Sequence, residues 1–344
     1  MIVTIATPLD AALVARVAAV PGVTEVLYDA ALLPPVRYPS DHGGDPAFRR
    51  TPDGERRFDA MLARADAIFG YPADTAAGLA HAVAVGTRLR FVQGTAAGAG
   101  AVVRAAALGP EALTRIAFAS AAGVHGGMLA EFVFYGLLAL RKDAARFERE
   151  RARRSWDHRA LGELAGSTLA ILGMGGIGTA LAARARAFEM RVIAIGRTAE
   201  PHPLADETFA SGDLPAAFAR ADAAVVTLPI TEKTHGLVDA RALAALPRHA
   251  IFCNVGRGAV VDQAALTAML RDGRLFGAVL DVFEPEPLPA NDPLWTMENV
   301  VFSPHTAALS VRENERIVAL FCENLERLAA GRPLRNAIDT VEFY

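Results

Sequence analysis

The hydrophobic positions of this chain form short apolar runs that alternate with segments of helical spacing. In the first third, Ile2–Ala6, Val23–Leu27 and Ala67–Phe69 have the length and composition of buried strands. Asp10–Val20 and Thr75–Val85 repeat apolar residues every three or four positions, as helices do. Strands that alternate with helices predict a parallel sheet with right-handed crossovers. The further elements predicted here are the helices Arg56–Ala65 and Ala99–Leu108, the strands Leu89–Val92 and Arg115–Ala119, and a loop over Leu33–Asp53.

A second series of strands begins with one that runs into a glycine-rich turn. Residues 169–178 read L-A-I-L-G-M-G-G-I-G, and a helical pattern over Ile177–Phe188 follows. Gly173, Gly175 and Gly178 have the spacing of the dinucleotide-binding fingerprint, which needs a tight turn, a close backbone approach to pyrophosphate and a helix packed closely on its strand. The N-terminus of the helix favours the phosphate charge. The turn therefore predicts a dinucleotide site.

The rest of the chain completes a second α/β domain. Its further strands are predicted at Arg191–Ile195, Ala223–Leu228, Ala250–Val255, Phe276–Leu280 and Val300–Phe302, and its helices at Asp239–Ala245 and Asp262–Arg271. We therefore predict an α/β protein with two Rossmann-like, doubly wound parallel-sheet domains and a cleft between them. Residues 1–118 with 310–344 are predicted to form the substrate domain, and residues 119–309 the dinucleotide-binding domain. The final helix, Ser310–Ala329, returns the chain to the first domain.

One long helical pattern runs from Gly126 to Arg151. Its first half is apolar on almost every face, which predicts that the helix is buried between two packed parts of the protein. This pattern also favours a homodimer through this helix. Its second half mixes arginines with acids such as Asp143 and Glu148, and mixed signs are typical of a solvated, ion-paired face rather than a nucleic-acid site.

Composition narrows the function classes. The 344 residues are 52% hydrophobic with a formal net charge of −3, so the chain has no field that attracts nucleic acid or an anionic membrane. Cys253 and Cys322 lie in apolar runs and are predicted to be buried thiols. The longest apolar stretch, Met128–Leu140, contains Glu131 and is too short to span a bilayer, and the N-terminal residues lack the pattern of a signal peptide. We expect a soluble, cytoplasmic protein without a metal site.

The residues after the second strand of the glycine-rich domain indicate which dinucleotide binds. Sites that prefer NAD place Asp or Glu there to hold the ribose 2′-hydroxyl, whereas this chain has Gly196 followed by Arg197 and Thr198. An arginine without a neighbouring carboxylate suits a 2′-phosphate. NADP(H) is favoured and NAD(H) is possible, because Arg197 is alternatively a solvent-exposed arginine.

Three segments with polar side chains follow other predicted strands, and the ends of these strands are where open α/β sheets bind ligands. Val255-Gly256-Arg257-Gly258 places an arginine between glycines, L-D-V-F-E-P-E-P (280–287) carries Asp281 and Glu286, and S-P-H-T (303–306) carries His305. Each alone also fits a surface arginine, capping acids or a satisfied histidine. Together they supply a carboxylate clamp, an acid and a titratable base.

The first domain has one comparable turn, Gly94-Thr95-Ala96-Ala97-Gly98-Ala99, between a predicted strand and helix. Exposed backbone amides in such a turn hold an anion. An ordinary βα loop is the alternative.

The motifs G-M-G-G-I-G, N-V-G-R-G-A-V-V-D, L-D-V-F-E-P-E-P-L-P and S-P-H-T-A together resemble the D-isomer-specific 2-hydroxyacid dehydrogenases. The resemblance is dense from about Leu161 to Ala308 and sparse in the first hundred residues. It implies hydride transfer between NAD(P)H and a small 2-oxo acid, with glyoxylate or hydroxypyruvate as the favoured substrate type.

The resemblance also implies a role for each motif residue. Arg257 would bind the substrate's carboxylate and carbonyl, His305 would act as acid/base, and Glu286 would pair with His305 and stabilise its imidazolium. The amides of Ala97 and Gly98 would hold the substrate carboxylate. The implied coenzyme-binding residues are Gly173, Gly175, Gly176, Ile177, Gly178, Arg197, Thr198, Leu228, Pro229, Val255, Gly256 and Asp281.

The chain also departs from the family pattern. Gly196-Arg197 replaces the usual Asp, and Ala119 and Ser120 stand where the hinge often carries asparagine. Glu286 is an acid where formate dehydrogenases have glutamine, so formate is rejected as substrate. A corepressor or scaffold of the same fold, which senses nicotinamide nucleotides, remains an alternative that predicts extended tails or a peptide groove. A relative that acts on another anion, such as phosphite, would need further cations near the Gly94–Ala99 turn.

Overall fold

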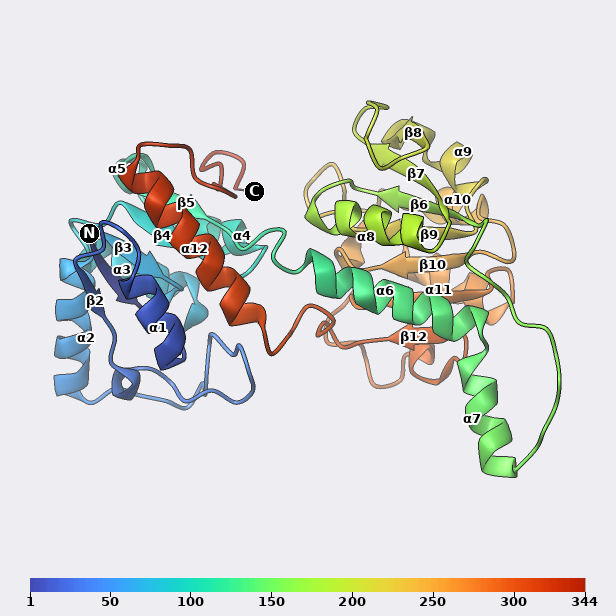
Figure 1. The fold of residues 1–344 in the computed structure, drawn as a ribbon, viewed down its shortest axis with the longest axis horizontal. Helices are drawn as coiled ribbons and strands as arrows, with labels where there is room; N and C mark the ends of the chain where they lie inside the picture. The colour runs from blue at the N-terminus through green and yellow to red at the C-terminus, as the bar shows by residue number, and fades with distance from the viewer. Residues whose placement is uncertain (344) are drawn as a thin grey trace. The chain divides into compact units, whose positions relative to one another are not determined.

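The computed structural model describes residues 1–343, which form two compact α/β units (Figure 1). One unit contains Met1–His125 and the chain from Leu309 onward, and the other is Gly126–Ala308. Tyr344, included in the predicted substrate domain, lies outside the described residues. The prediction of two parallel-sheet α/β domains is confirmed.

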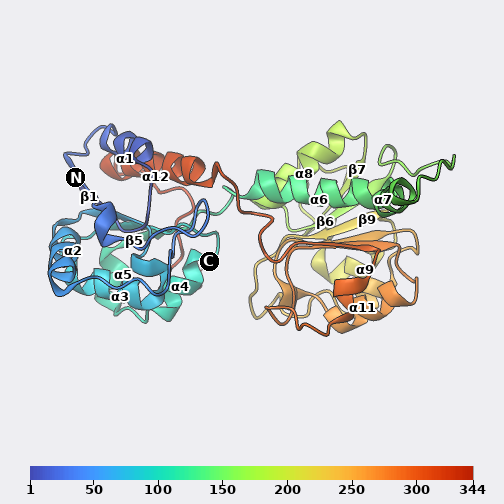
Figure 2. The same ribbon diagram turned by 90° about the horizontal axis from the view of Figure 1, so that it is seen from below.

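The first unit is built on a five-stranded sheet in the order β2-β1-β3-β4-β5, in which all neighbours are parallel. Its strands are β1 (Ile2–Ile5), β2 (Glu25–Leu27), β3 (Ala67–Phe69), β4 (Phe91–Gln93) and β5 (Ala117–Ala119). Helices α1 (Ala11–Ala18) and α12 (Glu313–Ala329) cover one face, and α2 (Pro52–Arg64), α3 (Ala76–Val85), α4 (Ala99–Ala105) and α5 (Pro110–Arg115) cover the other (Figure 2). Phe321 of α12 packs its ring against Phe69 and Phe91, so the two ends of the chain share one core.

The second unit is built on seven parallel strands in the order β12-β11-β10-β9-β6-β7-β8. The strands are β6 (Thr168–Leu172), β7 (Arg191–Gly196), β8 (Glu207–Ala210), β9 (Ala223–Val226), β10 (Ile251–Asn254), β11 (Gly277–Leu280) and β12 (Val300–Phe302). Helices α6 (Gly126–Arg141) and α8 (Gly176–Ala187) cover one face, and α9 (Leu214–Phe218), α10 (Ala240–Ala244) and α11 (Gln263–Arg271) cover the other (Figure 2). Counted from β6, the order extends the Rossmann order 3-2-1-4-5-6 by one strand and reverses direction between β6 and β9.

Several elements differ from the sequence-based prediction. A short helix, α5, was not predicted, and Arg115, predicted to begin a strand, is its last residue. The long helix ends at Arg141, and a separate helix, α7 (Ala144–Arg153), begins after Asp143, whose φ of 54° is left-handed and breaks the helix. Figure 1 shows α7 and the loop after it extending away from the sheet of this unit. Strand β8 was not predicted, because Glu207–Ala210 is a partly exposed edge strand without an apolar run.

The described residues contain no helix long and apolar enough to cross a membrane. Cys253 and Cys322 are buried free thiols, as predicted, and burial raises the pKa of both.

Candidate active site

The glycine-rich turn joins β6 to α8 at the point where the strand order reverses. Gly173 has a φ of +106°, and a Cβ on Gly178 would lie 2.0 Å from the carbonyl oxygen of Gly173, so neither position accepts a side chain without a shift of the backbone. A Cβ on Gly175 would meet no protein atom within 4 Å. The backbone N–H groups of Met174 and Gly175 donate no hydrogen bond within residues 1–343. The turn thus offers free donors and open space at a helix N-terminus, which fits a pyrophosphate.

Thr227 supports this turn and was not singled out from the sequence. Its hydroxyl lies 2.7 Å from the carbonyl oxygen of Gly173 and 3.1 Å from that of Leu172. Leu228 and Pro229 follow it, and a Cβ on Gly256 would lie 2.5 Å from the carbonyl oxygen of Leu228. The loops after β6, β9 and β10 are therefore in contact.

Arg197 and Thr198 are exposed directly after β7, at the same edge of the sheet. Within the described part of the chain, the guanidinium of Arg197 forms no ion pair, and the nearest preceding residue, Gly196, adds no charge. This edge of the sheet therefore carries, on Arg197, a positive charge without an ion-pair partner among residues 1–343.

Arg257 is half-buried on the turn after β10. Asn254 holds this turn, because its side-chain amide donates to the Arg257 carbonyl at 3.1 Å and its oxygen accepts from the Gly256 N–H at 3.1 Å. A Cβ on Gly258 would lie 1.9 Å from the carbonyl oxygen of Phe283, so this turn packs directly on the loop after β11. Val255 and Gly256 are buried beneath it. Asn254 is a supporting residue for which the sequence gave no separate signal.

His305 and Glu286 form a hydrogen-bonded pair in the loops after β12 and β11. His305 Nδ1 lies 2.8 Å from Glu286 Oε2, and Glu286 Oε1 accepts from the Phe283 N–H at 3.0 Å. Because an ionised carboxylate only accepts, Nδ1 carries a proton, and Nε2, which has no partner within residues 1–343, is left to exchange one. His305 has a φ of 55°, in the left-handed region that few residues other than glycine and asparagine adopt. This backbone conformation sets the direction of its side chain.

Asp281, at the end of β11, holds the loop of His305 through two hydrogen bonds. It is 1% exposed, its carbonyl accepts from the His305 N–H at 2.9 Å, and its side chain accepts from the Ala307 N–H at 3.0 Å. The position of His305 is thus determined by β11 as well as by its own strand.

An apolar pocket of about 470 Å³ opens beside the His305–Glu286 pair. Its other lining residues are Phe283, Pro287, Leu288, Trp295, Phe302 and Pro304. Trp295 and Phe302 meet edge to face, with ring centroids 4.9 Å apart.

The predicted anion turn lies in the first unit, after β4. Ala96, Ala97 and Gly98 are exposed, and the N–H groups of Ala97 and Gly98 form no hydrogen bond to any of residues 1–343. The turn rests on Gln93, which is fully buried and donates to the carbonyl oxygens of Gly94, Ala119 and Ser120 at 3.0, 3.3 and 3.1 Å. Asn324 of α12 in turn donates to Gln93 at 3.0 Å. This support was missed from the sequence.

The structure therefore brings the predicted residues together in two groups. The implied coenzyme residues, with Arg257, Glu286 and His305, lie after the strands of the second unit's sheet, whereas Ala97 and Gly98 lie in the first unit.

Comparison with known proteins agrees with this geometry. The sequence profile "D-isomer specific 2-hydroxyacid dehydrogenase, NAD binding domain" matches residues 134–307. An uncharacterized protein from the proB 3′ region of Corynebacterium melassecola is 37% identical over 267 residues, which cover 74% of this chain and 84% of that protein. This chain belongs to the D-isomer-specific 2-hydroxyacid dehydrogenase family. The predicted enzyme class, an NAD(P)-dependent D-2-hydroxyacid dehydrogenase, is confirmed at the level of the family.

Two further relatives of this dehydrogenase have described activities. Glyoxylate/hydroxypyruvate reductase B of Yersinia pestis is 41% identical over 175 residues, so the match spans about half of this chain, 50%, and 53% of that protein. The crystal structure of an NADPH-dependent glyoxylate/hydroxypyruvate reductase from Sinorhizobium meliloti, in complex with NADP and sulfate, superimposes with a TM-score of 0.75 and 25% identity. That match covers 100% of this chain and 99% of the other.

Proposed function

We propose that this dehydrogenase reduces a small 2-oxo acid of the glyoxylate or hydroxypyruvate type to a D-2-hydroxy acid, with NADPH as the preferred coenzyme. The observation that carries the proposal is the His305–Glu286 pair, 2.8 Å apart, in the loops after β12 and β11, and β11 lies beside β10, the strand that precedes Arg257. The names of the Yersinia and Sinorhizobium relatives support the same substrate type.

The second unit has the features that a bound dinucleotide requires. The free N–H groups at Met174 and Gly175 and the open space over Gly175 fit a pyrophosphate, and Arg197 fits a 2′-phosphate. When bound, the reduced coenzyme supplies the hydride. We propose that the second unit is the coenzyme domain and the first the substrate domain, as their sequences suggest.

His305 would hold the proton that the product oxygen needs. Negative charge develops on the carbonyl oxygen as the 2-oxo carbon is reduced, and a proton on Nε2 neutralises that charge. Glu286 fixes the orientation of the ring through its contact with Nδ1. In the reverse direction the neutral Nε2 accepts the hydroxyl proton.

Arg257 and the turn at Ala97–Gly98 would bind the substrate carboxylate. A guanidinium presents paired donors that match a carboxylate, and the free N–H groups of Ala97 and Gly98 are neutral donors of the same kind. Asp281 is proposed to accept from the nicotinamide amide.

A coenzyme-consumption assay tests the function. Purified protein is incubated with NADPH or NADH and a panel of 2-oxo acids, and absorbance of the reduced coenzyme is followed. Turnover of glyoxylate or hydroxypyruvate supports the proposal. Binding of coenzyme without turnover of any 2-oxo acid would favour the corepressor or scaffold alternative. Oxidation of phosphite with NADP would favour a relative that acts on another anion.

Replacing Arg197 with glutamine tests the coenzyme preference. We expect kcat/KM for NADPH to fall by about 10- to 100-fold, because a charged contact to the 2′-phosphate is lost, and that for NADH to change by less than about twofold. Arg271→Gln, an exposed arginine on α11, is the matched control. An unchanged NADPH/NADH ratio would show that Arg197 only faces solvent.

We also propose a homodimer through the segment that begins at Gly126. Tyr135 on α6, Phe147 on α7 and Trp156 after α7 are 62%, 43% and 89% exposed, which is unusual for large apolar side chains on neighbouring elements. We expect light scattering to give twice the 36.3 kDa of one chain, and Tyr135→Asp with Trp156→Ser to give the monomer. A wild-type monomer at assay concentration contradicts this proposal. The cytoplasmic location stays a prediction.

A further inference from the structure

The chain passes from one unit to the other twice, at His125–Gly126 and again at Ala308–Leu309. His125 is the last residue of the first unit before the first crossing. Its Nε2 lies 2.8 Å from Oε1 of Glu313, the first residue of α12, which follows the second crossing. A hydrogen bond inside the first unit therefore ties the two crossings to each other.

The His125–Glu313 pair is buried, with the two side chains only 10% and 5% exposed. The second carboxyl oxygen of Glu313 is also buried and has no hydrogen-bond partner among residues 1–343. The carboxyl group therefore depends on His125, because a buried polar group that loses its only partner is costly. This dependence holds the end of the first crossing on α12.

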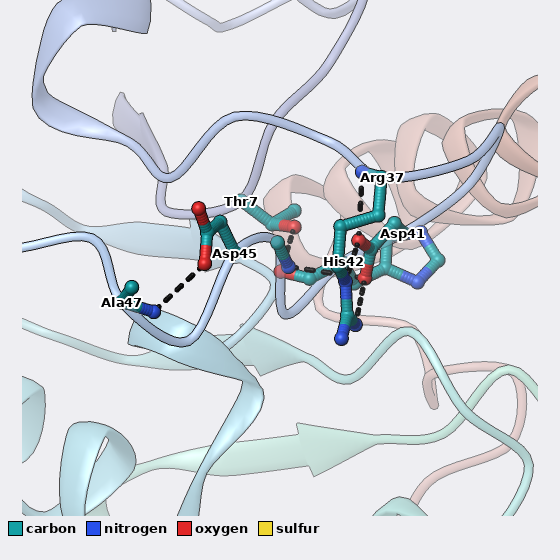
Figure 3. A network of polar contacts seen from close by, with 7 residues as sticks. Thr7, Arg37, Asp41, His42, Asp45 and Ala47 are labelled. Atoms are coloured by element: carbon teal, nitrogen blue, oxygen red, sulfur yellow. Dashed lines mark hydrogen bonds and ion pairs between the residues drawn. The ribbon is translucent and has the colours of Figure 1, made fainter.

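The start of α12 is itself fixed by the loop between β2 and α2. His42 Nε2 lies 2.8 Å from Asn314 Oδ1, and the His42 carbonyl accepts from the Thr7 hydroxyl at 2.9 Å (Figure 3). In the same loop, Asp41 accepts from Arg37 Nε at 2.7 Å and from Arg37 Nη2 at 2.9 Å (Figure 3). The Arg37 guanidinium holds the pKa of Asp41 down to about 2, so this ion pair persists at neutral pH. Helix α12 is thus a firm support for the buried pair.

The segment Ala121–Gly126 leads into the first crossing, and its start contacts the proposed substrate turn. The Ala121 N–H donates to the Ala96 carbonyl at 3.0 Å. Ala96 is joined directly to Ala97, one of the two residues whose free N–H groups are proposed to hold the substrate carboxylate. A shift of this segment therefore acts on the turn one residue away from the proposed carboxylate site.

The end of the same segment contacts the coenzyme turn of the second unit. A Cβ on Gly126 would lie 2.7 Å from the carbonyl oxygen of Gly176, so the two backbones approach closely there. Gly176 is joined directly to Gly175, whose free N–H fits a phosphate. Ala121 and Gly126 are five residues apart, so one short piece of chain touches both proposed binding turns.

We propose that His125 and Glu313 are positioning residues that hold the segment Ala121–Gly126 in place, so that bound coenzyme strengthens the binding of the hydroxy or oxo acid. This inference rests on the proposed reduction of 2-oxo acids. A firmly held segment passes a displacement of Gly176 on to Ala96, whereas a loose segment absorbs it. By linkage, the bound acid strengthens coenzyme binding by the same factor.

The measurement is the dissociation constant of NADPH with and without D-glycerate, the product that reduction of hydroxypyruvate would give. Both ligands are in their reduced forms, so no hydride moves and fluorescence titration reports binding alone. We expect saturating D-glycerate to tighten NADPH binding to the wild type by at least about fivefold. His125→Leu removes the donor and should lower this factor to within about twofold, while NADPH alone binds within about twofold of the wild-type constant.

Two matched variants separate this role from a merely structural one. His125→Gln offers an amide donor in place of Nε2, and we expect it to restore most of the wild-type factor. His81→Leu removes another histidine–carboxylate contact of the first unit, since His81 Nε2 lies 2.7 Å from Asp59 Oδ1. His81 and Asp59 lie on α3 and α2, far in sequence from both crossings, so His81→Leu should keep the wild-type factor.

Asn336→Gly tests the same segment without disturbing the buried pair. The Asn336 side-chain amide donates to the carbonyl of Ala122 at 2.6 Å, and glycine adopts the φ of 54° at this position freely. We expect this variant to lower the factor as well. It decides the question if His125→Leu does not fold, which the thermal midpoint of each variant reveals.

The outcomes separate this inference from the proposed function. The inference is wrong, and the proposed function stands, if D-glycerate does not tighten NADPH binding to a wild type that reduces hydroxypyruvate. It is equally wrong if folded His125→Leu keeps the wild-type factor, or if His125→Gln loses as much of it as His125→Leu does. If the wild type reduces no 2-oxo acid, both the proposed function and this inference are wrong.

Discussion

Replacing His305 with asparagine is expected to lower kcat for hydroxypyruvate by about 10²- to 10⁴-fold, the range that a positioned acid/base contributes. Asparagine tolerates the φ of 55° at this position, so the loop after β12 keeps its backbone. It cannot carry the proton that we propose His305 Nε2 delivers. Steady-state kinetics measures the loss, and fluorescence titration with NADPH should give a dissociation constant within about twofold of the wild type, because the proposed role of the ring is toward the substrate and not toward the coenzyme phosphates.

The matched control is His249→Asn. His249 also pairs with a carboxylate, with Nε2 2.7 Å from Asp222 Oδ1, but Asp222 precedes β9 and so lies at the opposite edge of the same sheet. We expect this variant to keep kcat. Residual activity above a tenth of wild type in His305→Asn would exclude an acid/base role for His305.

Replacing Arg257 with glutamine is expected to remove turnover almost entirely and leave coenzyme binding intact. Removal of one donor to a developing oxyanion costs about 10²- to 10³-fold in kcat, and the proposed contact of Arg257 with the substrate carboxylate would be lost as well. We therefore expect kcat to fall and KM to rise together. A residue that only positions another catalytic side chain would change kcat without this rise in KM. The side chain is half-buried and, within residues 1–343, its only hydrogen bond is to the Gly256 carbonyl, at 2.7 Å, so we expect the fold not to depend on its charge.

Partial rescue of Arg257→Gln by added guanidinium would support this role further. Turnover within about tenfold of wild type in this variant would refute it. The thermal midpoint of the variant should stay close to that of the wild type, because the hydrogen bonds of Asn254 hold the turn without the guanidinium.

The fold could be predicted from the sequence where its signals are local. The apolar runs and the glycine spacing identify β6, the turn at Gly173 and the parallel strands around it, since each depends on a few neighbouring residues. Strand β8 lacks such a run, because an edge strand buries only part of its surface. The break at Asp143 was also missed, because acids and arginines at helical spacing continue across it.

In the candidate site, too, residues with a local sequence signal were predicted and residues that act through distant contacts were not. Arg257, Asp281 and His305 were placed at one edge of a sheet because each follows an apolar strand. The residues that hold the loops were missed, since Thr227 reaches Gly173 and Gln93 reaches Ala119, which lie more than twenty residues away in the sequence.

The discontinuity of the first unit has a consequence for how the protein is made. Phe69 and Phe91 pack against Phe321, which leaves the ribosome only after the whole of Gly126–Ala308 has been synthesised. At the usual rate of about 5–20 residues per second, these two rings wait for their partner for about 10–50 seconds. The unit Gly126–Ala308 is continuous in sequence, so all its strands are synthesised before α12. The strands of the first unit therefore lack the cover of α12 while Gly126–Ala308 is synthesised.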